Sequence, residues 1–416
     1  MSTSIVIVTA ILASLSFLLV KHTLRPKKPP LPPGPKGLPL LRNIRDLPPP
    51  GTLEWPHWQS HKEKYGPITS VSVLGQNFVI LHDRQVIMDL LETRAMKSAS
   101  RPKLVFAGDM VSGSIMLRIL YNYETDSDKN DHIVTMANLV MGEFSEATTP
   151  GAWMVDFIPW LRHIPEWMPG AGFKKTAKLF RHHLLKNVQD PYQYVRDQMT
   201  NGKGDVSYVA GLIKYIHRKI DPEEESIIAW TAASMMNAGT DTTGATLLAF
   251  FAAMVIYPKV QKKAQEEISR ATGDSRLPSF TDKPNLPYTT AIAQEVLRWH
   301  TLAPMGFPHM TTEDDTYRGY FIPKNTLLFP AVASLTHDPE VYHDPMEFKP
   351  ERYFEPYNEP SPSDLVFGFG RRSCPGRWIA EQTLFLSIAQ TLAVFRIERE
   401  VDAEGREIES RLTKTP

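Results

Sequence analysis

The sequence predicts a mainly α-helical fold with a small β portion. A segment from about Asp221 to Ile256 has few helix breakers and is much longer than an average helix. Further helical segments run from about Tyr288 to His300 and from about Arg377 to Ala393, whereas β-rich runs are few and short. Proline supplies 35 of 416 residues, about 8% against about 5% in average usage, so rigid extended segments and turns should interrupt the helices.

The N-terminal twenty residues predict a membrane anchor. Residues 1–20 contain no charged side chain, and as a helix they would rise about 30 Å, the thickness of a bilayer core. Lys21 and Arg25 follow directly, which predicts a cytosolic body. A cleaved signal peptide is the alternative, but no basic region precedes the apolar run. Residues 21–50 then form a basic, proline-rich linker that should act as a semi-rigid strut, and residues 51–416 form the body.

The first part of the body predicts a small mixed unit. Pro56 to Tyr65 is typical of a short helix, and Arg84 to Thr93 carries apolar residues at helical spacing. Between them, Ile68 to Val73 and Phe78 to Leu81 are β-rich runs on either side of a turn signal, which predicts a hairpin. The middle of the long helix, from Ala232 to Phe251, is small and apolar and should be buried on most sides.

Composition excludes several classes of function. Lys+Arg and Asp+Glu are equal at 46 each, so no basic field for nucleic acid is present. A single cysteine excludes an intramolecular disulfide framework and a cysteine-cluster zinc site. His337 and His343 do not have the spacing of a standard metal-ligand pair, and Pro339 interrupts a helix between them.

The lone cysteine, Cys374, lies in a glycine-rich segment directly before a predicted helix. The segment reads Phe-Gly-Phe-Gly-Arg-Arg-Ser-Cys-Pro-Gly-Arg from Phe367 to Arg377. Its glycines permit tight turns and the close approach of a flat ligand. Backbone N–H groups and a helix N-terminus near the sulfur should favour a thiolate. A buried, inert thiol is the ordinary fate of an isolated cysteine, but this long pattern favours a ligand.

This segment resembles the haem-binding loop of the cytochrome P450 family, whose members are haem-thiolate monooxygenases. The resemblance implies a shortened P450 fold that binds haem, with Cys374 as the axial ligand and Phe367 in the same loop. Arg372 and, as a further carry-over, His309 would hold the haem propionates. A solvated loop histidine is the alternative for His309.

The long helix carries a second motif of the family. Ala238-Gly239-Thr240-Asp241-Thr242-Thr243 is similar to the family's oxygen-activation motif. Small Ala238 would leave room over a porphyrin, and the Thr242 hydroxyl can bond back to a carbonyl and distort the helix. The resemblance implies that Asp241 and Thr242 relay protons. A mid-helix threonine outside such a motif would more often be plain core.

A third set of residues resembles the family's structural triad. Glu295 and Arg298 stand at i and i+3 on one helix, which alone is typical of a solvated surface pair. Downstream, the run from Phe348 to Tyr353 resembles the loop whose arginine joins that pair, which here is Arg352. The three residues would then be structural and would support the haem loop.

By this resemblance, two segments of the family are missing. Residues 101–150 contain no tryptophan, so the family's Trp-x-x-x-Arg helix region is absent, with a gap near Val111 and Ser112. The chain also stops after Pro416, before the family's C-terminal hairpin. Unpartnered haem propionates and uncovered apolar surface should follow. We therefore expect weak haem binding, which a carbon-monoxide difference spectrum at full haem stoichiometry would contradict.

The resemblance implies a function and leaves two alternatives. The first hypothesis is an enzyme of the endoplasmic reticulum membrane, single-pass with a cytosolic body. It would oxidise an apolar small molecule, a secondary metabolite or xenobiotic, with O2 and electrons from an NADPH-cytochrome P450 reductase, because no nucleotide fingerprint is visible. The arginines 371, 372 and 377 would form a cationic docking face. Substrate-contact regions would include Met235, Met236, Ala303, Met305 and Phe307.

The alternatives are different in kind. One is a truncated, catalytically impaired family member that binds haem weakly or not at all. The other is a hydrolase with Cys374 as nucleophile, which needs a paired histidine base that the sequence does not indicate.

Overall fold

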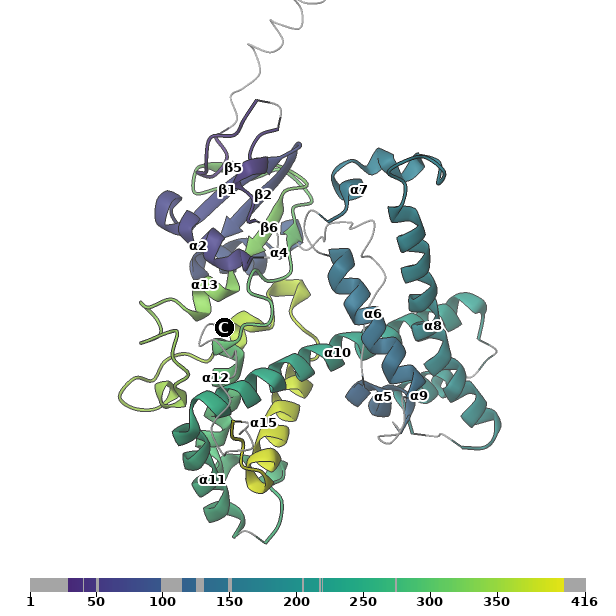
Figure 1. The fold of residues 1–416 in the computed structure, drawn as a ribbon, viewed down its shortest axis with the longest axis vertical. Coiled ribbons are helices and arrows are strands. Elements are labelled where there is room, and N and C mark those ends of the chain that lie inside the picture. Colours follow the sequence, from purple (N-terminus) through teal and green to yellow (C-terminus); the bar gives the residue numbers. More distant parts are fainter. Residues whose placement is uncertain are drawn as a thin grey trace, which may run out of the picture.

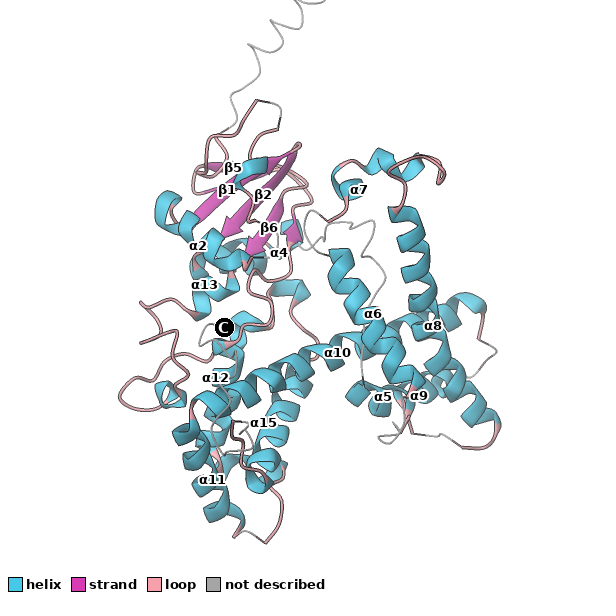
Figure 2. Cartoon of the chain, viewed as in Figure 1, coloured by secondary structure: helices cyan, strands magenta, loops and turns pink. Residues whose placement is uncertain are grey.

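A computed structural model describes residues 29–39, 41–49, 52–98, 114–124, 131–148, 152–203, 206–216, 218, 220–273 and 275–399. Within these residues the fold is mainly helical, with one four-stranded and one two-stranded sheet (Figures 1 and 2), and the predicted fold class is confirmed. Two groups of helices are joined by the long helix α10, and the sheets lie beyond one of these groups (Figure 1). The predicted anchor, residues 1–20, lies outside the described residues.

The four-stranded sheet has the order β1-β2-β6-β3. Strands β1 and β2 form the predicted hairpin, which turns through Leu74 and Gly75, both with positive φ. β2 begins two residues earlier than predicted. β6 pairs parallel to β2 and antiparallel to β3. The strands are β1 (Ile68–Val73), β2 (Gln76–Leu81), β3 (His309–Met310), β4 (Asp315–Tyr317), β5 (Tyr320–Ile322) and β6 (Leu327–Pro330).

The proline-rich strut is docked on the sheets. The Ser70 N–H of β1 donates to the Pro33 carbonyl at 2.8 Å, and the Phe321 N–H of β5 donates to the Pro30 carbonyl at 2.8 Å. A Cβ at Gly34 would lie 1.9 Å from the Ser70 carbonyl oxygen, so only glycine permits this approach. The strut therefore has a fixed path over the residues that the structure describes.

Short helices flank the sheets and loops. The helix predicted from Arg84 to Thr93 begins as α3, capped by the Asp83 side chain, and widens into the π-helix η2. The short helices are η1 (Ile44–Asp46), α2 (Glu54–Tyr65), α3 (Arg84–Ile87), η2 (Met88–Thr93), α4 (Ala95–Ser98), α7 (Met154–Phe157), η3 (Pro159–His163), η4 (Phe280–Asn285), α13 (Val332–Thr336), η5 (Pro350–Tyr353), α14 (Ser363–Val366) and η6 (Gly370–Arg372).

Two apolar cores occupy the two helix groups. The first joins the N-terminal half of α10 to α5 (Ser114–Tyr121), α6 (His132–Thr148), α8 (Phe173–Thr200) and α9 (Tyr208–Tyr215). The second joins the C-terminal half of α10 to α11 (Pro258–Thr272), α12 (Pro287–Trp299) and α15 (Arg377–Val394). The last two helices confirm those predicted near Tyr288 and Arg377.

The helix α10 (Pro222–Ile256) confirms the predicted long helix. Asp221 caps it in a capping box with Glu224, and Pro222 occupies its first turn. Among the described helices, α10 alone has the length and hydropathy of a membrane span, but both of its halves pack into protein cores. The expectation that its middle, Ala232 to Phe251, is buried on most sides is confirmed, since most of the described residues there are buried or half-buried. The exposed ones are Ser234, Ala238, Gly244, Leu248 and Phe251.

Candidate active site

The loop that carries Cys374 is held from two sides. The Cys374 N–H donates to the Phe367 carbonyl at 2.7 Å, which closes the loop. The Gly370 N–H donates to the Glu92 carboxylate at 2.5 Å. Gly370 has a φ of 55°, and a Cβ there would lie 2.3 Å from the Leu91 carbonyl oxygen, so glycine lets the loop press against η2. The loop is therefore positioned by hydrogen bonds and by close backbone packing.

The Cys374 thiol is exposed and free of any disulfide. It lies directly before α15, and a Cβ at Gly376 would lie 3.8 Å from the sulfur. Among the described residues, no group of three or more His, Cys, Asp or Glu side chains could hold a metal ion. One exposed sulfur cannot satisfy a bare metal ion, but it matches a metal that brings its other ligands with it. The residues present therefore fit haem iron better than a protein-only metal site.

The other side chains of the loop differ in their exposure and in their contacts with neighbouring residues. Phe367 is half-buried, with the Arg377 guanidinium over its ring at 5.8 Å from the centroid. Arg377 also pairs with Asp364 at 3.1 Å and with Glu381 at 3.3 Å. Arg372 is exposed on the same loop. Phe367, Arg372 and Cys374 thus come from one segment, and Arg377 is committed to partners within the protein.

The motif on α10 places a hydroxyl and a small side chain on one helix face. The Thr242 Oγ1 donates to the Ala238 carbonyl at 2.7 Å, the back-bond that the sequence predicts. Thr246 repeats this contact with the Thr242 carbonyl at 2.8 Å. The helix runs on through the motif without interruption, so the predicted local distortion is not seen in its hydrogen-bond pattern. The side chain of Asp241 lies outside what the structure describes.

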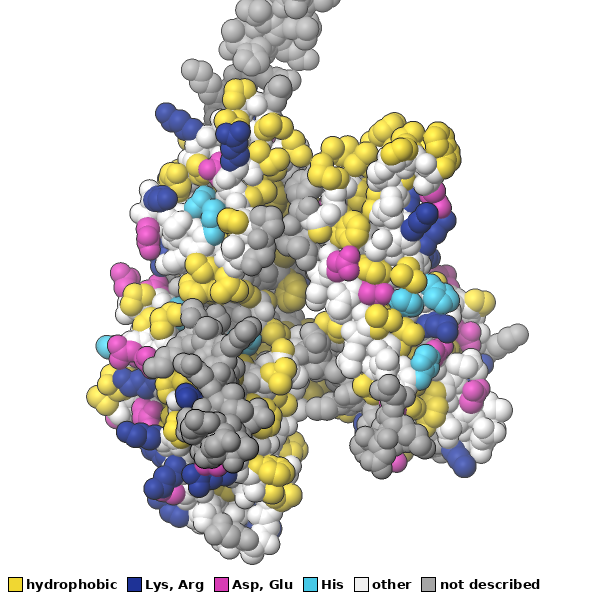
Figure 3. Space-filling model, viewed as in Figure 1, with side chains coloured by type: hydrophobic (Ala, Val, Ile, Leu, Met, Phe, Trp, Pro, Cys, Tyr) yellow, Lys and Arg dark blue, Asp and Glu magenta, His cyan; other side chains and the backbone are white. Residues whose placement is uncertain are grey.

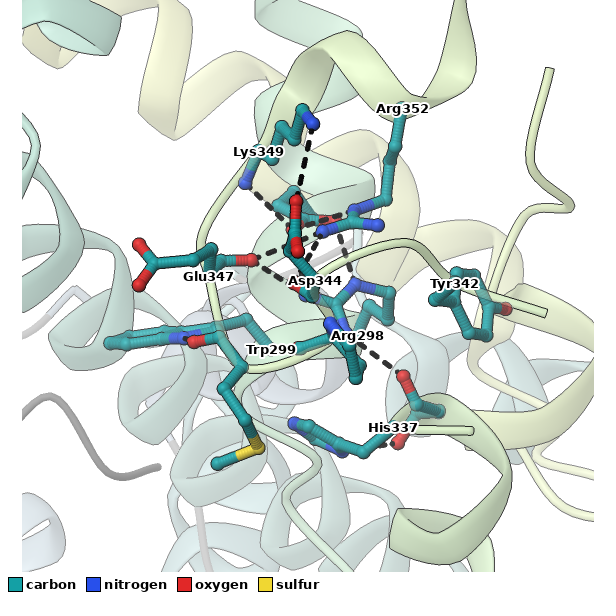
Figure 4. A network of polar contacts seen from close by, with 12 residues as sticks. Arg298, Trp299, His337, Tyr342, Asp344, Glu347, Lys349 and Arg352 are labelled. Atoms are coloured by element: carbon teal, nitrogen blue, oxygen red, sulfur yellow. Dashed lines mark hydrogen bonds and ion pairs between the residues drawn. The ribbon is translucent and has the colours of Figure 1, made fainter. Parts of the chain in front are cut away.

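Glu295, Arg298 and Arg352 meet in one buried network. Figure 4 shows the two arginines of this network and the loop around them. All three side chains are 0% exposed. Arg298 donates from Nε and Nη2 to the two Glu295 carboxylate oxygens at 2.9 and 2.8 Å, and Arg352 Nε donates to Oε1 at 3.0 Å. The interpretation of Glu295 and Arg298 as a solvated surface pair is therefore wrong.

Further partners complete the network. The Glu295 carboxylate also accepts hydrogen bonds from the Lys349 N–H at 2.9 Å and from the Tyr353 hydroxyl at 3.0 Å. The other guanidinium N–H groups of Arg298 and Arg352 donate to backbone carbonyls of α13 and of the loop that follows it (Figure 4), and Arg352 also donates to the Glu359 carboxylate. Every charged group is thus satisfied, and the network ties α12 to the long loop before η5.

Glu359 is a member that sequence analysis missed. It accepts from Arg352 Nη1 at 2.5 Å and from the His343 ring and backbone at 2.9 Å. Burial raises the pKa of Glu359, but the hydrogen bonds from Arg352 and His343 outweigh it and hold that pKa below its ordinary value. No sequence pattern connects Glu359 to the triad, because its contact depends on how the loop folds back.

His309 lies in β3 and is 2% exposed, with Nδ1 in a 3.0 Å hydrogen bond with the Ser98 carbonyl. The alternative of a solvated loop histidine is therefore wrong.

Two of the expected substrate-contact residues are buried in apolar cores. Met236 packs in the core around α5, α6 and α8, and Met305 packs beside the four-stranded sheet. Phe307 is exposed, whereas Met235 and Ala303 are half-buried.

Comparisons with known proteins agree with this site. A cytochrome P450 family model matches residues 109–416. The chain is 39% identical to the cytochrome P450 monooxygenase claR of Ampulloclitocybe clavipes over 446 residues, which cover 91% of this chain and 82% of that protein. It is 35% identical to the cytochrome P450 monooxygenase CLM2 of Gibberella zeae over 480 residues, covering 99% and 90%. The O-methylsterigmatocystin oxidoreductase of Aspergillus flavus is 32% identical over 453 residues, covering 92% and 86%.

The lengths of these matches carry further information. Each aligned stretch is longer than the 416 residues of this chain. The relatives therefore have internal positions without a counterpart here. The place of the gap, near residue 111, stays a prediction.

Proposed function

The chain belongs to the cytochrome P450 family, and from this premise we propose that it is a membrane-anchored, haem-dependent monooxygenase of the endoplasmic reticulum. It inserts one atom of O2 into an apolar small molecule of secondary or xenobiotic metabolism. The observation that carries the proposal is the exposed, unpaired Cys374 thiol on a loop fixed directly before α15. This retained loop and the family match favour the enzyme over a member that has lost haem.

Some residues of the site would bind haem, and others would deliver protons. Cys374 would ligate the iron, Arg372 and His309 would hold the propionates, and Phe367 and Ala238 would contact the porphyrin. Haem, when bound there, supplies the activation of O2. The Thr242 hydroxyl donates a hydrogen bond to the Ala238 carbonyl at 2.7 Å, so its oxygen keeps lone pairs to accept a second hydrogen bond. In a relay, Thr242 would release its hydroxyl proton as it takes one supplied by Asp241, and Asp241 would be reprotonated from solvent.

Electrons would come from an NADPH-cytochrome P450 reductase. Arg371 and Arg372 are exposed next to the Cys374 loop and would give an acidic partner a cationic docking face. Arg377 contributes less than the sequence suggests, because Asp364 and Glu381 already neutralise it.

We predict that oxygen from ¹⁸O2 enters the product only when the reductase and NADPH are both present.

We also predict that Thr242→Ala lowers the amount of product formed per NADPH by roughly a hundredfold, because the variant lacks the hydroxyl that passes protons on. Thr246→Ala is the matched control, since Thr246 makes the same back-bond one turn later. Equal losses in the two variants, measured by mass spectrometry of the product, would argue against a proton role for Thr242.

A surface patch supports contact of the body with a membrane. Apolar side chains gather over α7 and the segment that follows it (Figure 3). Trp160 and Trp167 are 69% and 80% exposed, and indole rings favour the membrane interface. Lys175 is exposed at the start of α8, where it can meet anionic headgroups, whereas the half-buried Lys174 donates from Nζ to the Ile164 carbonyl at 2.6 Å.

We predict that brominated lipids quench tryptophan fluorescence of the full chain in vesicles, and that Trp160→Phe with Trp167→Phe removes most of this quenching. Both rings would lie at the depth of the bromine atoms. Trp378→Phe is the matched control, because Trp378 is 72% exposed but lies on α15. The patch has no lipid contact if the Trp378 variant loses as much quenching as the double variant.

A further inference from the structure

Buried polar atoms without a hydrogen-bond partner are concentrated around the helix α2, which packs on both β1 and α13 (Figure 1). Of the ten such side-chain atoms among the described residues, five lie on α2 or on the segments beside it. They are Oε1 of Gln59 and Nδ1 of His61 on α2, Nδ1 of His82 directly after β2, Oγ of Ser334 on α13, and Nε2 of His337 directly after α13.

Three of these five atoms are ring nitrogens of histidines. His61 and His82 are buried, and His337 is half-buried. The other nitrogen of two rings is engaged, since His82 Nε2 lies 3.1 Å from the Thr69 hydroxyl and His337 Nδ1 lies 3.1 Å from the Ala333 carbonyl. A protonated imidazole needs an acceptor at both nitrogens, and a buried charge without one is costly. The packed arrangement therefore accommodates these rings in their neutral form.

The same helix joins the proline-rich strut to the body. The Trp55 ring of α2 stacks on the His337 ring, with 5.7 Å between the ring centroids. One turn further, the His57 ring nitrogen Nε2 lies 2.9 Å from the carbonyl oxygen of Asp46, the last residue of η1. A change in the packing of α2 is thus transmitted to the end of the strut.

Burial and nearby cations keep protons off these rings. Burial and then the Lys62 charge lower the pKa of His82 to about 3, and burial and then the Arg298 charge lower the pKa of His337 to about 4. The pKa of His61 is also lowered, chiefly by burial. The segments β1, β2 and α13 contribute no Asp, Glu, Lys or Arg. The titratable and charged groups that face the three rings are Glu54, His57, Lys62, Lys64 and Tyr65 of α2, Asp46 of η1, Asp338 beyond α13, and Arg298 and Arg352 of the buried triad.

The direction of the pH effect follows from these shifts. A solvated histidine has a pKa of about 6.5, so above that pH the rings are neutral whether α2 is packed or released. As the pH falls below about 6.5, the released state takes up protons that the packed state does not, and release becomes more favourable. From pH 7 to pH 5 the equilibrium constant for release rises by roughly twentyfold for each of His82 and His337 that becomes solvated.

We propose that His61, His82 and His337 form an acid-sensitive latch, which holds α2 against the four-stranded sheet and α13 and releases it when the rings take up protons. Release also loosens the end of the strut, because His57 of α2 holds the Asp46 carbonyl. The latch depends neither on haem nor on the proposed reaction, so it can be tested in the full chain without either.

The first test is amide hydrogen exchange of the full chain in detergent, corrected for the intrinsic effect of pH on exchange. Protection of residues 54–65 should fall by roughly twentyfold to several hundredfold between pH 7 and pH 5, and return when the pH is restored. The helix α11, which contains no histidine, should keep its protection. Equal protection of α2 at the two pH values, an equal fall in α11, or a fall that is not reversed would each overturn the proposal.

Two substitutions remove the titrating rings but retain their hydrogen bonds. His82→Gln places an amide near the position of Nε2, beside Thr69, and His337→Asn places one near the position of Nδ1, beside the Ala333 carbonyl. Each should make the fall in protection roughly twentyfold smaller. His163→Gln is the matched control, because His163 is exposed, and it should behave as the parent chain does. The same fall in all three variants would contradict the latch.

A measurement on the unaltered chain decides the matter if these variants do not fold. Trp58 of α2 is 6% exposed and packs in the core with Val71 and Ile80. Hydroxyl radicals should oxidise it several-fold faster at pH 5 than at pH 7, because release uncovers its ring. Trp378, which is 72% exposed on α15, should be oxidised at the same rate at both pH values. A Trp58 rate that does not change with pH would rule out the release of α2.

Discussion

Replacing Cys374 by alanine is expected to abolish the haem-thiolate absorption band and the monooxygenase activity together. Cys374 is the chain's only cysteine, and the described residues offer no His, Cys, Asp or Glu cluster to replace it. Its sulfur sits on a loop held by the 2.7 Å hydrogen bond from the Cys374 N–H to Phe367 and by Gly370 against η2. The backbone contacts survive the substitution, so the variant should stay folded while it loses the ligand.

The measurement is a carbon-monoxide difference spectrum of the reduced, hemin-supplied protein, with product formation measured in parallel. Ser373→Ala is the matched control, because Ser373 is the exposed neighbour of Cys374 on the same loop. The control should keep the thiolate band and its activity. A thiolate band or haem-dependent oxygenation that survives in Cys374→Ala would show that this sulfur is not the axial ligand.

The sequence predicted those features that local chemistry decides. The long helix was predictable because Asp221 and Pro222 supply a start signal and few breakers follow until Pro258. The hairpin was predictable because two β-rich runs flank a short turn containing Gly75. The Cys374 loop and the Thr242 back-bond were likewise visible, since each lies within a few consecutive residues.

Features that depend on tertiary contacts were not predictable. The spacing of Glu295 and Arg298 is the same on a solvated face as in a core, so periodicity alone could not reveal that both are fully buried. Only the resemblance of the run from Phe348 to Tyr353 to the family's triad loop indicated it. Glu359 reaches Arg352 only because the loop returns on itself. The apolar middle of α10 indicated burial, which most of its residues show, but burial also needs a covering element, and none of the described elements covers Leu248 and Phe251 fully.

Replacing Glu295 by glutamine is expected to lower the free energy of unfolding by about 3–5 kcal/mol, the usual cost of removing one partner from a buried charge network. Glu295 accepts hydrogen bonds from Arg298, Arg352 and Tyr353, and all three members of the triad are 0% exposed. Glutamine keeps the shape but removes the negative charge. It also turns an NH2 group toward guanidinium donors, so two buried cations lose their shared counter-charge.

Denaturant unfolding of the full chain in detergent measures this cost. Glu398→Gln is the matched control, because Glu398 pairs with Arg396 at 2.6 Å on the surface, with both side chains more than half exposed. That exposed pair should contribute no more than about 1 kcal/mol. The two substitutions remove the same charge from the same kind of pair and differ in burial. Similar small losses in both would mean that the triad contributes no more than a surface ion pair, and that its place beneath the loop before η5 is not what fixes this part of the fold.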